Sequence, residues 1–475
     1  MKKSVVLLIL ICWFSTSDAL IIRIPQDYPT ISEGTNASMD GDTVMVSPGI
    51  YPDYVNMNGK NILLTSEQGP EVTFIERQIR GFNGNDTTTI IRGFDITENS
   101  SGTIFSGIYI YDGSSCIIEG NIIHDCVVEV TYSGGGISID SPNRSSSIIR
   151  NNVIRDNYHD DFGGGIAING HGFKIVGNII SSNYAGFYDD SWGAGGIKAG
   201  GSEFNISYNL IVDNQSGYWG PTEFGGGGAV VILRTSEYRS IISNNTFVNN
   251  RCYGYNENAG SGLVVFNAHE LSVKNNIYAY NQQGGFHSTY QYDLDYNLFW
   301  QNEYGDYEGS QPGPNSLFED PLFVNLDNGD YNLQEDSPCI DAGDPNSPLD
   351  PDSTRADIGC YYYHHITDVT EPDSSNSPHK FYLEQNYPNP FNGQTIISYY
   401  LSEASDVELN IINMKGELVS KPVNSHQSAG NHSLIWQGNR TDGVPVATGI
   451  YFYELKVLDS YTPQSREVKA MILLK

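Results

Sequence analysis

The sequence predicts an all-β protein in which a long solenoid of stacked coils is followed by a small β-sandwich. One short phrase with an Asn at its centre recurs along the middle of the chain, which is the signature of a solenoid. The composition, with 50 Gly and 32 Tyr among 475 residues, favours short strands and tight turns over helices. Beyond residue 380, apolar and polar residues alternate as they do in the strands of a sandwich.

The chain is strongly acidic. It has 25 Lys and Arg against 56 Asp and Glu, a formal net charge of −31. Residues 20–379 hold 15 of these basic residues and 46 of the acidic ones, so the excess lies in that part of the chain. Such a surface repels nucleic acids and other polyanions unless bound Ca²⁺ bridges them to the protein. We therefore expect neutral glycans or divalent cations as partners, and no nucleic acid.

The first residues indicate a secreted protein. Lys2 and Lys3 precede an apolar run over residues 5–14, and Ser17 and Ala19 are small residues before a cleavage point after Ala19. This pattern predicts a signal peptide over residues 1–19. An apolar run of about ten residues is too short to cross a bilayer, which needs about 20. We expect no transmembrane segment after the signal peptide is removed.

Five cysteines remain after that cleavage. An oxidising destination permits disulfides, but five cysteines in a chain of this length are too few for a disulfide scaffold. We expect Cys339 to pair with Cys360, and Cys116, Cys126 and Cys252 to be buried thiols.

The repeat unit is about 30 residues long and is marked by two polar positions five residues apart. The first is the Asn at the centre of phrases such as IIEGNII, IIRNNVI and KIVGNII, and a pair of small residues precedes a short strand in most units, as in GGISI and GGIAI. The first position is held by Asn121, Asn152, Asn178, Asn209, Asn245, Asn276 and Asn297, and the second by Cys126, Asn157, Asn183, Asn214, Asn250, Asn281 and Asn302.

These repeats predict a stack of coils whose alternate apolar residues face inward, with turns where Asn or Gly adopts the left-handed conformation. Asn side chains at equivalent positions of neighbouring coils can hydrogen-bond along the axis and satisfy buried turn amides. We therefore interpret the repeated Asn residues as structural rather than as ligand contacts.

Residues 20–303 resemble the right-handed parallel β-helix proteins of the pectin-lyase-like group. The N-terminal phrase IPQDYPTISEGTNASMDGDTVMVSPGIY is similar to the start of that group. The resemblance implies that Pro29 opens a short amphipathic helix covering the end of the core, and that DGDTVMVSPGIY forms the first coil. A covered end is also expected physically, because an open solenoid end exposes core and strand edges.

Residues 304–366 resemble the tail that follows such β-helices in secreted bacterial proteins. This segment is rich in Asp, and several carboxylates within a short loop can hold Ca²⁺, although their spacing does not match an EF-hand. The alternative is an acidic, turn-rich closure without a metal. The residues concerned are Asp341, Asp344, Asp350, Asp352 and Asp357.

Residues 367–379 are rich in Ser, Pro and Asp and predict a linker. Residues 380–475 predict a small immunoglobulin-like β-sandwich. This segment resembles the type A sorting domain of the type IX secretion system, through NYPNPFN, MKGELV, VATGIYFY and the end KAMILLK. The resemblance implies export by the type IX machinery across a bacterial outer membrane, and a protein that is then released or held on the cell surface.

The insertions between the second polar position of a coil and the next small-residue pair recur at one phase of the repeat, so we expect them on one side of the stack. They carry aromatic residues and carboxylates, which suit the apolar faces and hydroxyl groups of sugar rings. The alternative is that the aromatic residues only pack the loops. The predicted substrate-binding residues are Tyr158, Tyr188, Trp192, Tyr218, Trp219, Glu223, Tyr253 and Tyr255.

The resemblance to the pectin-lyase-like group also implies two catalytic possibilities. A polysaccharide lyase needs a base beside a uronate, often with Ca²⁺, and Lys198 lies on a predicted strand beside the acidic loops. A glycoside hydrolase needs two positioned carboxylates. The candidate carboxylates, which are also the candidate Ca²⁺ ligands, are Asp160, Asp161, Asp189 and Asp190.

None of these residues forms a recognisable catalytic motif, so the sequence leaves open whether the protein is an enzyme. The favoured hypothesis is a secreted or cell-surface β-helix protein that binds an extracellular polysaccharide. The first alternative is a polysaccharide lyase or glycoside hydrolase acting on an extracellular glycan. The second is a structural or adhesive protein that recognises another protein.

Overall fold

The computed structural model describes most of the chain after residue 18. The described residues are 19–98, 106–128, 134–142, 146–160, 162–186, 193–217, 227–233, 239–253, 260–266, 268, 270–363, 365, 381–383, 386, 391–392, 394–402, 404–413, 416–441, 443–446, 449–458 and 465–474. The predicted signal peptide lies outside these residues, apart from Ala19.

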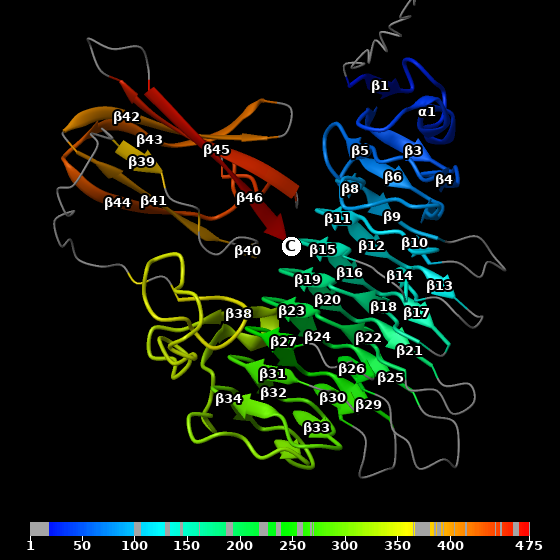
Figure 1. The fold of residues 1–475 in the computed structure, drawn as a ribbon. Helices are drawn as coiled ribbons and strands as arrows, with labels where there is room; N and C mark the ends of the chain where they lie inside the picture. The colour runs from blue at the N-terminus through cyan, green and yellow to red at the C-terminus, as the bar shows by residue number, and fades with distance from the viewer. Residues whose placement is uncertain are drawn as a thin grey trace, which may run out of the picture.

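A parallel β-helix forms the body of the molecule. Figure 1 shows its strands stacked coil upon coil from β1 to β34. In the described part of the chain the strands of the β-helix form four parallel sheets, here named A to D. Each coil from β11 to β30 passes through sheet A, then B, then D, then C, before it returns to sheet A.

Sheets A and B share the first repeated Asn, which lies at the turn between them. Sheet A consists of β1 (Ile21–Ile24), β2 (Thr43–Val46), β5 (Leu63–Ser66), β8 (Ile90–Arg92), β11 (Ile117–Glu119), β15 (Ile148–Arg150), β19 (Lys174–Val176), β23 (Asn205–Ser207), β27 (Ser240–Ser243), β31 (Leu271–Lys274) and β34 (Asp293–Asp295). Sheet B consists of β3 (Gly49–Tyr51), β6 (Thr73–Ile75), β9 (Asp95–Ile96), β12 (Ile122–His124), β16 (Val153–Arg155), β20 (Ile179–Ser181), β24 (Leu210–Val212), β28 (Thr246–Val248), β32 (Ile277–Ala279) and β35 (Leu298–Trp300).

Sheets C and D lie on either side of the insertions. Sheet C consists of β4 (Val55–Asn56), β7 (Ile79–Gly81), β10 (Ile108–Tyr111), β14 (Ile137–Asp140), β18 (Ile166–His171), β22 (Ile197–Ser202), β26 (Val230–Leu233), β30 (Leu263–Phe266), β33 (Phe286–Ser288) and β36 (Tyr307–Glu308). Sheet D consists of β13 (Val127–Val128), β17 (Tyr158–His159), β21 (Tyr184–Ala185), β25 (Gln215–Ser216) and β29 (Arg251–Cys252).

The core of the β-helix is built from stacked aliphatic and aromatic side chains. Ile118, Ile149 and Ile175 are in register on neighbouring strands of sheet A, and all three are fully buried. Phe247, Tyr278 and Phe299 stack along sheet B with ring centroids 4.8 and 5.1 Å apart. This in-register stacking is what a repeated apolar position produces in parallel strands.

The repeated Asn residues form two buried ladders, as predicted. Asn152 donates from Nδ2 to Oδ1 of Asn178 at 3.0 Å, and Asn178 donates in the same way to Asn209 at 3.0 Å. The second ladder repeats this geometry from Asn157 to Asn183 at 3.0 Å. The structural interpretation of the repeated Asn residues is therefore confirmed.

The turns differ from the prediction in one respect. The left-handed residue is the one before each ladder Asn, and its type varies from coil to coil. Gly120 and Asn151 fit the prediction, but Tyr208, Ser182 and Asp213 have φ of 56°, 55° and 56° in the same position. A bulky residue tolerates this conformation here because the ladder hydrogen bonds on its C-terminal side hold the turn.

The N-terminal end is covered by helix α1 (Ile31–Ala37), as the resemblance implied. Ile31 is fully buried, and Gly34 lies so close to Ile24 that an added Cβ would be 2.6 Å from its Cδ1. Pro29 lies just before the helix rather than opening it. The N-cap is Thr30, whose side chain accepts from the N–H of Glu33 at 3.1 Å.

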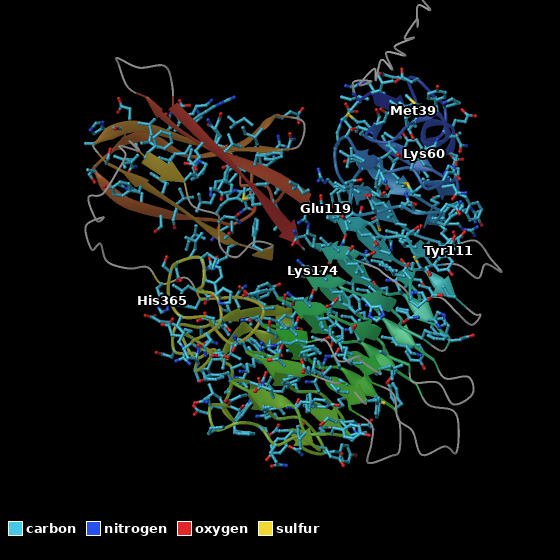
Figure 2. All side chains as sticks on the ribbon, in the orientation of Figure 1. Met39, Lys60, Tyr111, Glu119, Lys174 and His365 are labelled. Atoms are coloured by element: carbon cyan, nitrogen blue, oxygen red, sulfur yellow. The ribbon has the colours of Figure 1, made fainter. Side chains whose placement is uncertain are left out.

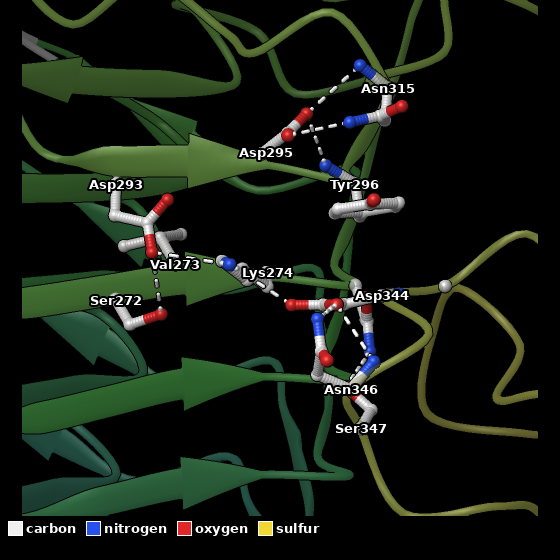
Figure 3. Close-up of polar contacts among 12 residues, drawn as sticks. Ser272, Val273, Lys274, Asp293, Asp295, Tyr296, Asn315, Asp344, Asn346 and Ser347 are labelled. Carbon is white, nitrogen blue, oxygen red and sulfur yellow. Dashed lines mark hydrogen bonds and ion pairs between the residues drawn. The ribbon is translucent and has the colours of Figure 1, made fainter.

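The tail after the β-helix contains β37 (Phe323–Asn325), η1 (Leu326–Asn328) and β38 (Asp330–Leu333), and it packs on the outer face of sheet B. Figure 3 shows one of its attachments: Lys274 Nζ lies 3.0 Å from Asp344 and 3.2 Å from Asp293. The N–H of Asp344 also donates to Asn275 Oδ1 at 2.7 Å.

The predicted disulfide between Cys339 and Cys360 is wrong for this structure, because both are free thiols. Both side chains lie in the apolar cluster beneath the tail, and burial raises the pKa of each. Cys116, Cys126 and Cys252 are buried thiols that form no disulfide, as expected.

The C-terminal part is a β-sandwich with a core of its own. One sheet consists of β39 (Phe381–Leu383), β41 (Thr395–Leu401) and β44 (Gly430–Trp436). The other consists of β40 (Phe391–Asn392), β42 (Ser405–Asn413), β43 (Leu418–Gln427), β45 (Gly449–Leu458) and β46 (Ser465–Leu474). The turn expected at MKGELV joins β42 to β43, where the N–H of Asn413 donates to the carbonyl of Glu417 at 3.0 Å.

Candidate functional site

The insertions leave the end of sheet D and return to the start of sheet C. The structure describes the strands on which they stand and a few flanking residues. Tyr158, Asp160, Lys198 and Tyr253 are the predicted site residues that it describes. The others lie outside the described residues and stay predictions: Asp161, Tyr188, Asp189, Asp190, Trp192, Tyr218, Trp219, Glu223 and Tyr255.

Sheet D presents one outward side chain per coil at the base of the insertions, and we call this set the sheet D row. Its strands pair in register, and the second residue of each strand points into the molecule, where His159, Ala185 and Ser216 are fully buried. The first residue of each strand therefore faces outward. The sheet D row consists of Val127, Tyr158, Tyr184, Gln215 and Arg251.

The two tyrosines of the row stack on each other. The ring centroids of Tyr158 and Tyr184 are 5.5 Å apart with an interplanar angle of 6°. The two rings therefore lie parallel to each other on neighbouring coils. The Tyr158 hydroxyl donates to Asp160 Oδ1 at 2.5 Å. Burial, and then the nearby Tyr253, raise the pKa of Tyr184, so its hydroxyl is a neutral hydrogen-bonding group at neutral pH.

Arg251 organises the other end of the row. Its guanidinium carbon lies 5.2 Å from the centroid of the Tyr253 ring, and Nη1 donates to the Tyr253 hydroxyl at 2.8 Å. That hydroxyl lies 3.4 Å from Gln215 Oε1, and Arg251 Nε contacts Gln282 Oε1 on the next coil. Tyr253 is 45% exposed. The result is a connected group of hydroxyl, amide and guanidinium side chains held in place by one another.

The outer face of sheet C is covered, which changes the interpretation of Lys198. The residues before each sheet C strand fold back over it and form a ladder of bridges from Gly163 through Ala194 and Gly227 to Gly260. The predicted small-residue pairs thus serve close packing, because a Cβ added to Gly227 would lie 2.6 Å from Val231 Cγ2.

Lys198 points away from the core of the β-helix, but it is only 8% exposed. Its Nζ lies 3.8 Å from the centroid of the Phe162 ring, a cation–π contact. Phe162 in turn lies edge-on to His159, with centroids 5.5 Å apart. Lys198 is thus packed against an aromatic side chain rather than displayed in an open groove.

His287 occupies the same outward row of sheet C as Lys198, near the end of the sheet. Its Nδ1 lies 3.1 Å from Glu308 Oε2, and the residue is 5% exposed. Within the described residues, its Nε2 is buried without a hydrogen-bond partner.

No group of three or more His, Cys, Asp or Glu side chains that could hold a metal ion is found among the described residues. Asp160 accepts from Tyr158, and the other three carboxylates proposed as Ca²⁺ ligands in the insertions lie outside the described range. In the tail, Asp344 is paired with Lys274, and Asp357 accepts from two backbone N–H groups. A Ca²⁺ site stays a prediction.

Sequence analysis missed Gln215, Arg251 and Gln282. Each immediately follows the second repeated Asn of its coil, so a position-by-position alignment of the coils contains the signal. The residue type changes from coil to coil, which hides that signal from a search for a repeated chemical group.

In the described part of the chain no helix is long and apolar enough to cross a membrane.

Two parts of the chain match known families. Residues 80–261 match the family described as the right handed beta helix region, and residues 386–460 match the FlgD Ig-like domain. No curated protein matches the chain in sequence.

Three solved structures are similar in part. Dimeric latent PorU from Porphyromonas gingivalis is 20% identical over 21% of this chain and 10% of PorU, with a TM-score of 0.19, so the chain spans only a small part of PorU. XylC in complex with xylose is 11% identical over 95% of this chain and 99% of XylC, with a TM-score of 0.30. A mutant of AlyGC, a PL6 family alginate lyase, is 13% identical over 75% of this chain and 60% of AlyGC, with a TM-score of 0.23.

The family matches agree with the sheets described above. The chain is an all-β protein made of a right-handed parallel β-helix followed by an immunoglobulin-like β-sandwich.

Proposed function

We propose that the protein binds an extracellular polysaccharide through the sheet D row and the insertions that follow it in the chain. The observation that carries this proposal is the connected polar group of Gln215, Arg251 and Tyr253, which continues the stacked pair Tyr158 and Tyr184 along one edge of the β-helix. Neighbouring parallel strands lie about 4.8 Å apart, so the four members of the row after Val127 offer a linear array of hydrogen-bonding groups. A linear array of this kind suits a polymer whose hydroxyl groups also recur along a line.

The side chains of the row are held before any ligand arrives. Tyr158 is fixed by Asp160 and by stacking, and Arg251 by Tyr253 and Gln282. Ordering a free, rotamer-rich side chain on binding costs about 0.5–1.5 kcal/mol, and this cost is reduced where the side chain is already ordered. The acidic body of the protein favours a neutral glycan over a polyanionic one.

The described residues favour binding over catalysis. A lyase base has to reach a proton on the substrate, whereas Lys198 is packed on Phe162 and covered by the Gly163–Gly260 ladder. A hydrolase needs two carboxylates on either side of a bond, and the described candidate, Asp160, is engaged by the Tyr158 hydroxyl.

The experiment is to apply the purified chain to a panel of neutral and acidic polysaccharides, with Ca²⁺ or with a chelator, and to measure both retention and released reducing ends. Retention on a neutral glycan without release of reducing ends is the expected result. Release of reducing ends would overturn the choice of binding over hydrolysis or lysis, and absorbance of an unsaturated product would identify a lyase. Failure of every glycan to retain the protein would contradict the proposal altogether.

We further propose that residues 380–475 direct export through the type IX secretion machinery to the medium or the outer surface of a bacterium. The match of residues 386–460 to an Ig-like domain family and the turn between β42 and β43 support a compact, separate signal domain. The test is a reporter protein fused to residues 367–475 and expressed in a bacterium with and without that machinery. The proposal predicts export only where the machinery is present, and export that is independent of the machinery would contradict it.

A further inference from the structure

A cavity that is partly open to solvent lies between the tail and the β-helix, away from the sheet D row. Its volume is about 280 Å³. One wall is formed by Tyr208 and Asn244, at turns between sheets A and B, and the other by Leu349, Asp350 and Pro351 of the tail. Figure 2 shows the positions of the tail and of sheet C. The tail, marked by His365, and sheet C, marked by Tyr111, lie at opposite sides of the molecule in this view.

Asp350 and Asp357 are the two carboxylates that line this cavity. Asp350 is 8% exposed. Its Oδ2 accepts from the N–H of Asp357 at 2.8 Å, while Oδ1 has no hydrogen-bond partner among the described residues. Asp357 differs, because its two oxygens accept from the N–H groups of Asp341 at 2.7 Å and Tyr363 at 2.5 Å. One oxygen of the Asp350 carboxylate is therefore left for a ligand in the cavity.

The remaining walls are aromatic and apolar. Tyr208 is 39% exposed and is held at φ 56° in the turn before Asn209. Burial, and then the charge of Asp350, raise the pKa of Tyr208, so its hydroxyl stays neutral beside the carboxylate. Leu349 and Pro351 add aliphatic surface, and the rest of the lining comes from Gly359, Cys360 and Tyr362.

This combination selects one class of ligand. Ca²⁺ takes six to eight oxygen ligands. The cavity offers fewer free oxygens, because the carboxylate of Asp357 accepts from two backbone N–H groups. The carbonyl oxygen of Asp357 accepts from Asn244 at 3.0 Å. A primary ammonium group needs one carboxylate and gains from an aromatic ring nearby. We propose that the cavity binds a small primary amine, with Asp350 as the counter-ion and the Tyr208 ring as a wall.

Protonation controls this site. Burial, and then the charge of Asp357, raise the pKa of Asp350 to about 7, and the pKa of Asp357 is also raised to about 7. The other charged groups that face the pair are Asp341, which lies 3.2 Å from His365 Nε2, and Asp352. Asp350 loses its charge below that pKa, so binding should be about tenfold weaker at pH 6 than at pH 8.

The test is calorimetric titration of the full chain at pH 8 and at pH 6 with N-α-acetyl-lysine methylamide, and with glucosamine at pH 7. N-α-acetyl-norleucine methylamide and N-acetylglucosamine lack the ammonium group and serve as neutral controls. Binding of either amine, but of neither control, supports the proposal, and the amine that binds identifies a lysine-like or an amino-sugar source. Binding of neither amine at any of these pH values would overturn it.

Two variants localise the site. Asp350→Asn should lower the affinity for the amine at least tenfold at pH 8, while Asp327→Asn, which removes an exposed carboxylate of the same tail, should leave it unchanged. Tyr208→Asn removes the ring and keeps a residue type that tolerates the left-handed conformation, so it should weaken binding severalfold in a folded protein. An unchanged affinity in folded Asp350→Asn would overturn the assignment.

Discussion

Asn178 Oδ1 accepts two hydrogen bonds from Asn152, one from the side-chain Nδ2 at 3.0 Å and one from the backbone N–H at 3.0 Å. Asn178 in turn donates to the carbonyl of Ile149 at 2.9 Å and to Asn209 at 3.0 Å. A single side chain thus satisfies buried groups on the coil before it, and its own amide is satisfied by the coil after it. The β-helix is held together by this reciprocity as well as by its apolar core.

Asn178→Ala should destabilise the protein by about 2–4 kcal/mol. The change leaves the Nδ2 and N–H of Asn152 and the carbonyl of Ile149 without these partners in a buried site, and each unsatisfied buried group costs about 1–3 kcal/mol before relaxation. The measurement is the midpoint of denaturant unfolding. Asn169→Ala is the matched control, since Asn169 is exposed and donates to Asp140, and it should change stability by less than about 0.5 kcal/mol. Equal effects of the two changes would contradict the structural role of the ladder.

Gly164→Ala should also be strongly destabilising. A Cβ at this position would lie 2.6 Å from the carbonyl oxygens of Gly195 and Tyr184, both of them backbone atoms that cannot move aside independently. We expect a loss of about 1–3 kcal/mol, as for other overpacked positions. Gly200→Ala is the control, because its nearest neighbour, the Leu233 carbonyl oxygen, is at 3.5 Å. Thermal unfolding of both variants measures the difference, and similar melting temperatures would show that the small-residue pairs are not packing positions.

Asp350→Asn should stabilise the protein at pH 8 and have little effect at pH 5. The pKa of Asp350 is about 7 in the folded protein, above the value of an unfolded Asp, so the folded state binds the proton more tightly between about pH 4 and pH 7. Folding stability therefore falls as the pH rises through that window, and the neutral amide escapes the penalty. After discounting for solvent screening, we expect Asp350→Asn to raise the free energy of unfolding at pH 8 by about 1 kcal/mol. Thermal melts at the two pH values check this, and a larger gain at pH 5 than at pH 8 would contradict it.

The thiols should be unreactive in the folded protein. Burial raises the pKa of Cys116, Cys126 and Cys360 to about 12, so almost no thiolate is present at neutral pH. A thiol reagent should label none of the five cysteines of residues 20–475 in the native state, and all five after unfolding without a reductant. Labelling of only three after unfolding, with Cys339 and Cys360 the two that stay unlabelled, would show that these two are paired after all.

Much of the β-helix is predictable from sequence because its signals are local and repeated. The ladder Asn residues recur within apolar phrases, and a polar residue at a buried position has to find a partner on the neighbouring coil. The left-handed Tyr208 is not predictable in this way, because it is the neighbouring Asn209 that holds the turn. Sheet D has strands of two residues, such as Tyr158–His159, which are too short to show a period.

The site is predictable only in part. Tyr158 and Tyr253 stand out by their chemistry and lie where the insertions begin, as expected. Gln215 and Arg251 were missed because their role depends on their position in the row rather than on a repeated residue type. The packing of Lys198 on Phe162 depends on a ladder formed between coils, and contacts of this kind leave no mark in a single repeat.

The most direct test of the central claim compares two arginines that lie on different faces of the β-helix. Arg251→Ala removes the charged member of the sheet D row, whereas Arg155→Ala removes an arginine on the outer face of sheet B that pairs with Asp156. Affinity for the glycan retained from the panel should fall about tenfold with Arg251→Ala, as expected for loss of a charged hydrogen bond, and change less than about twofold with Arg155→Ala. Equal affinities of the two folded variants would contradict the assignment of glycan binding to the sheet D row.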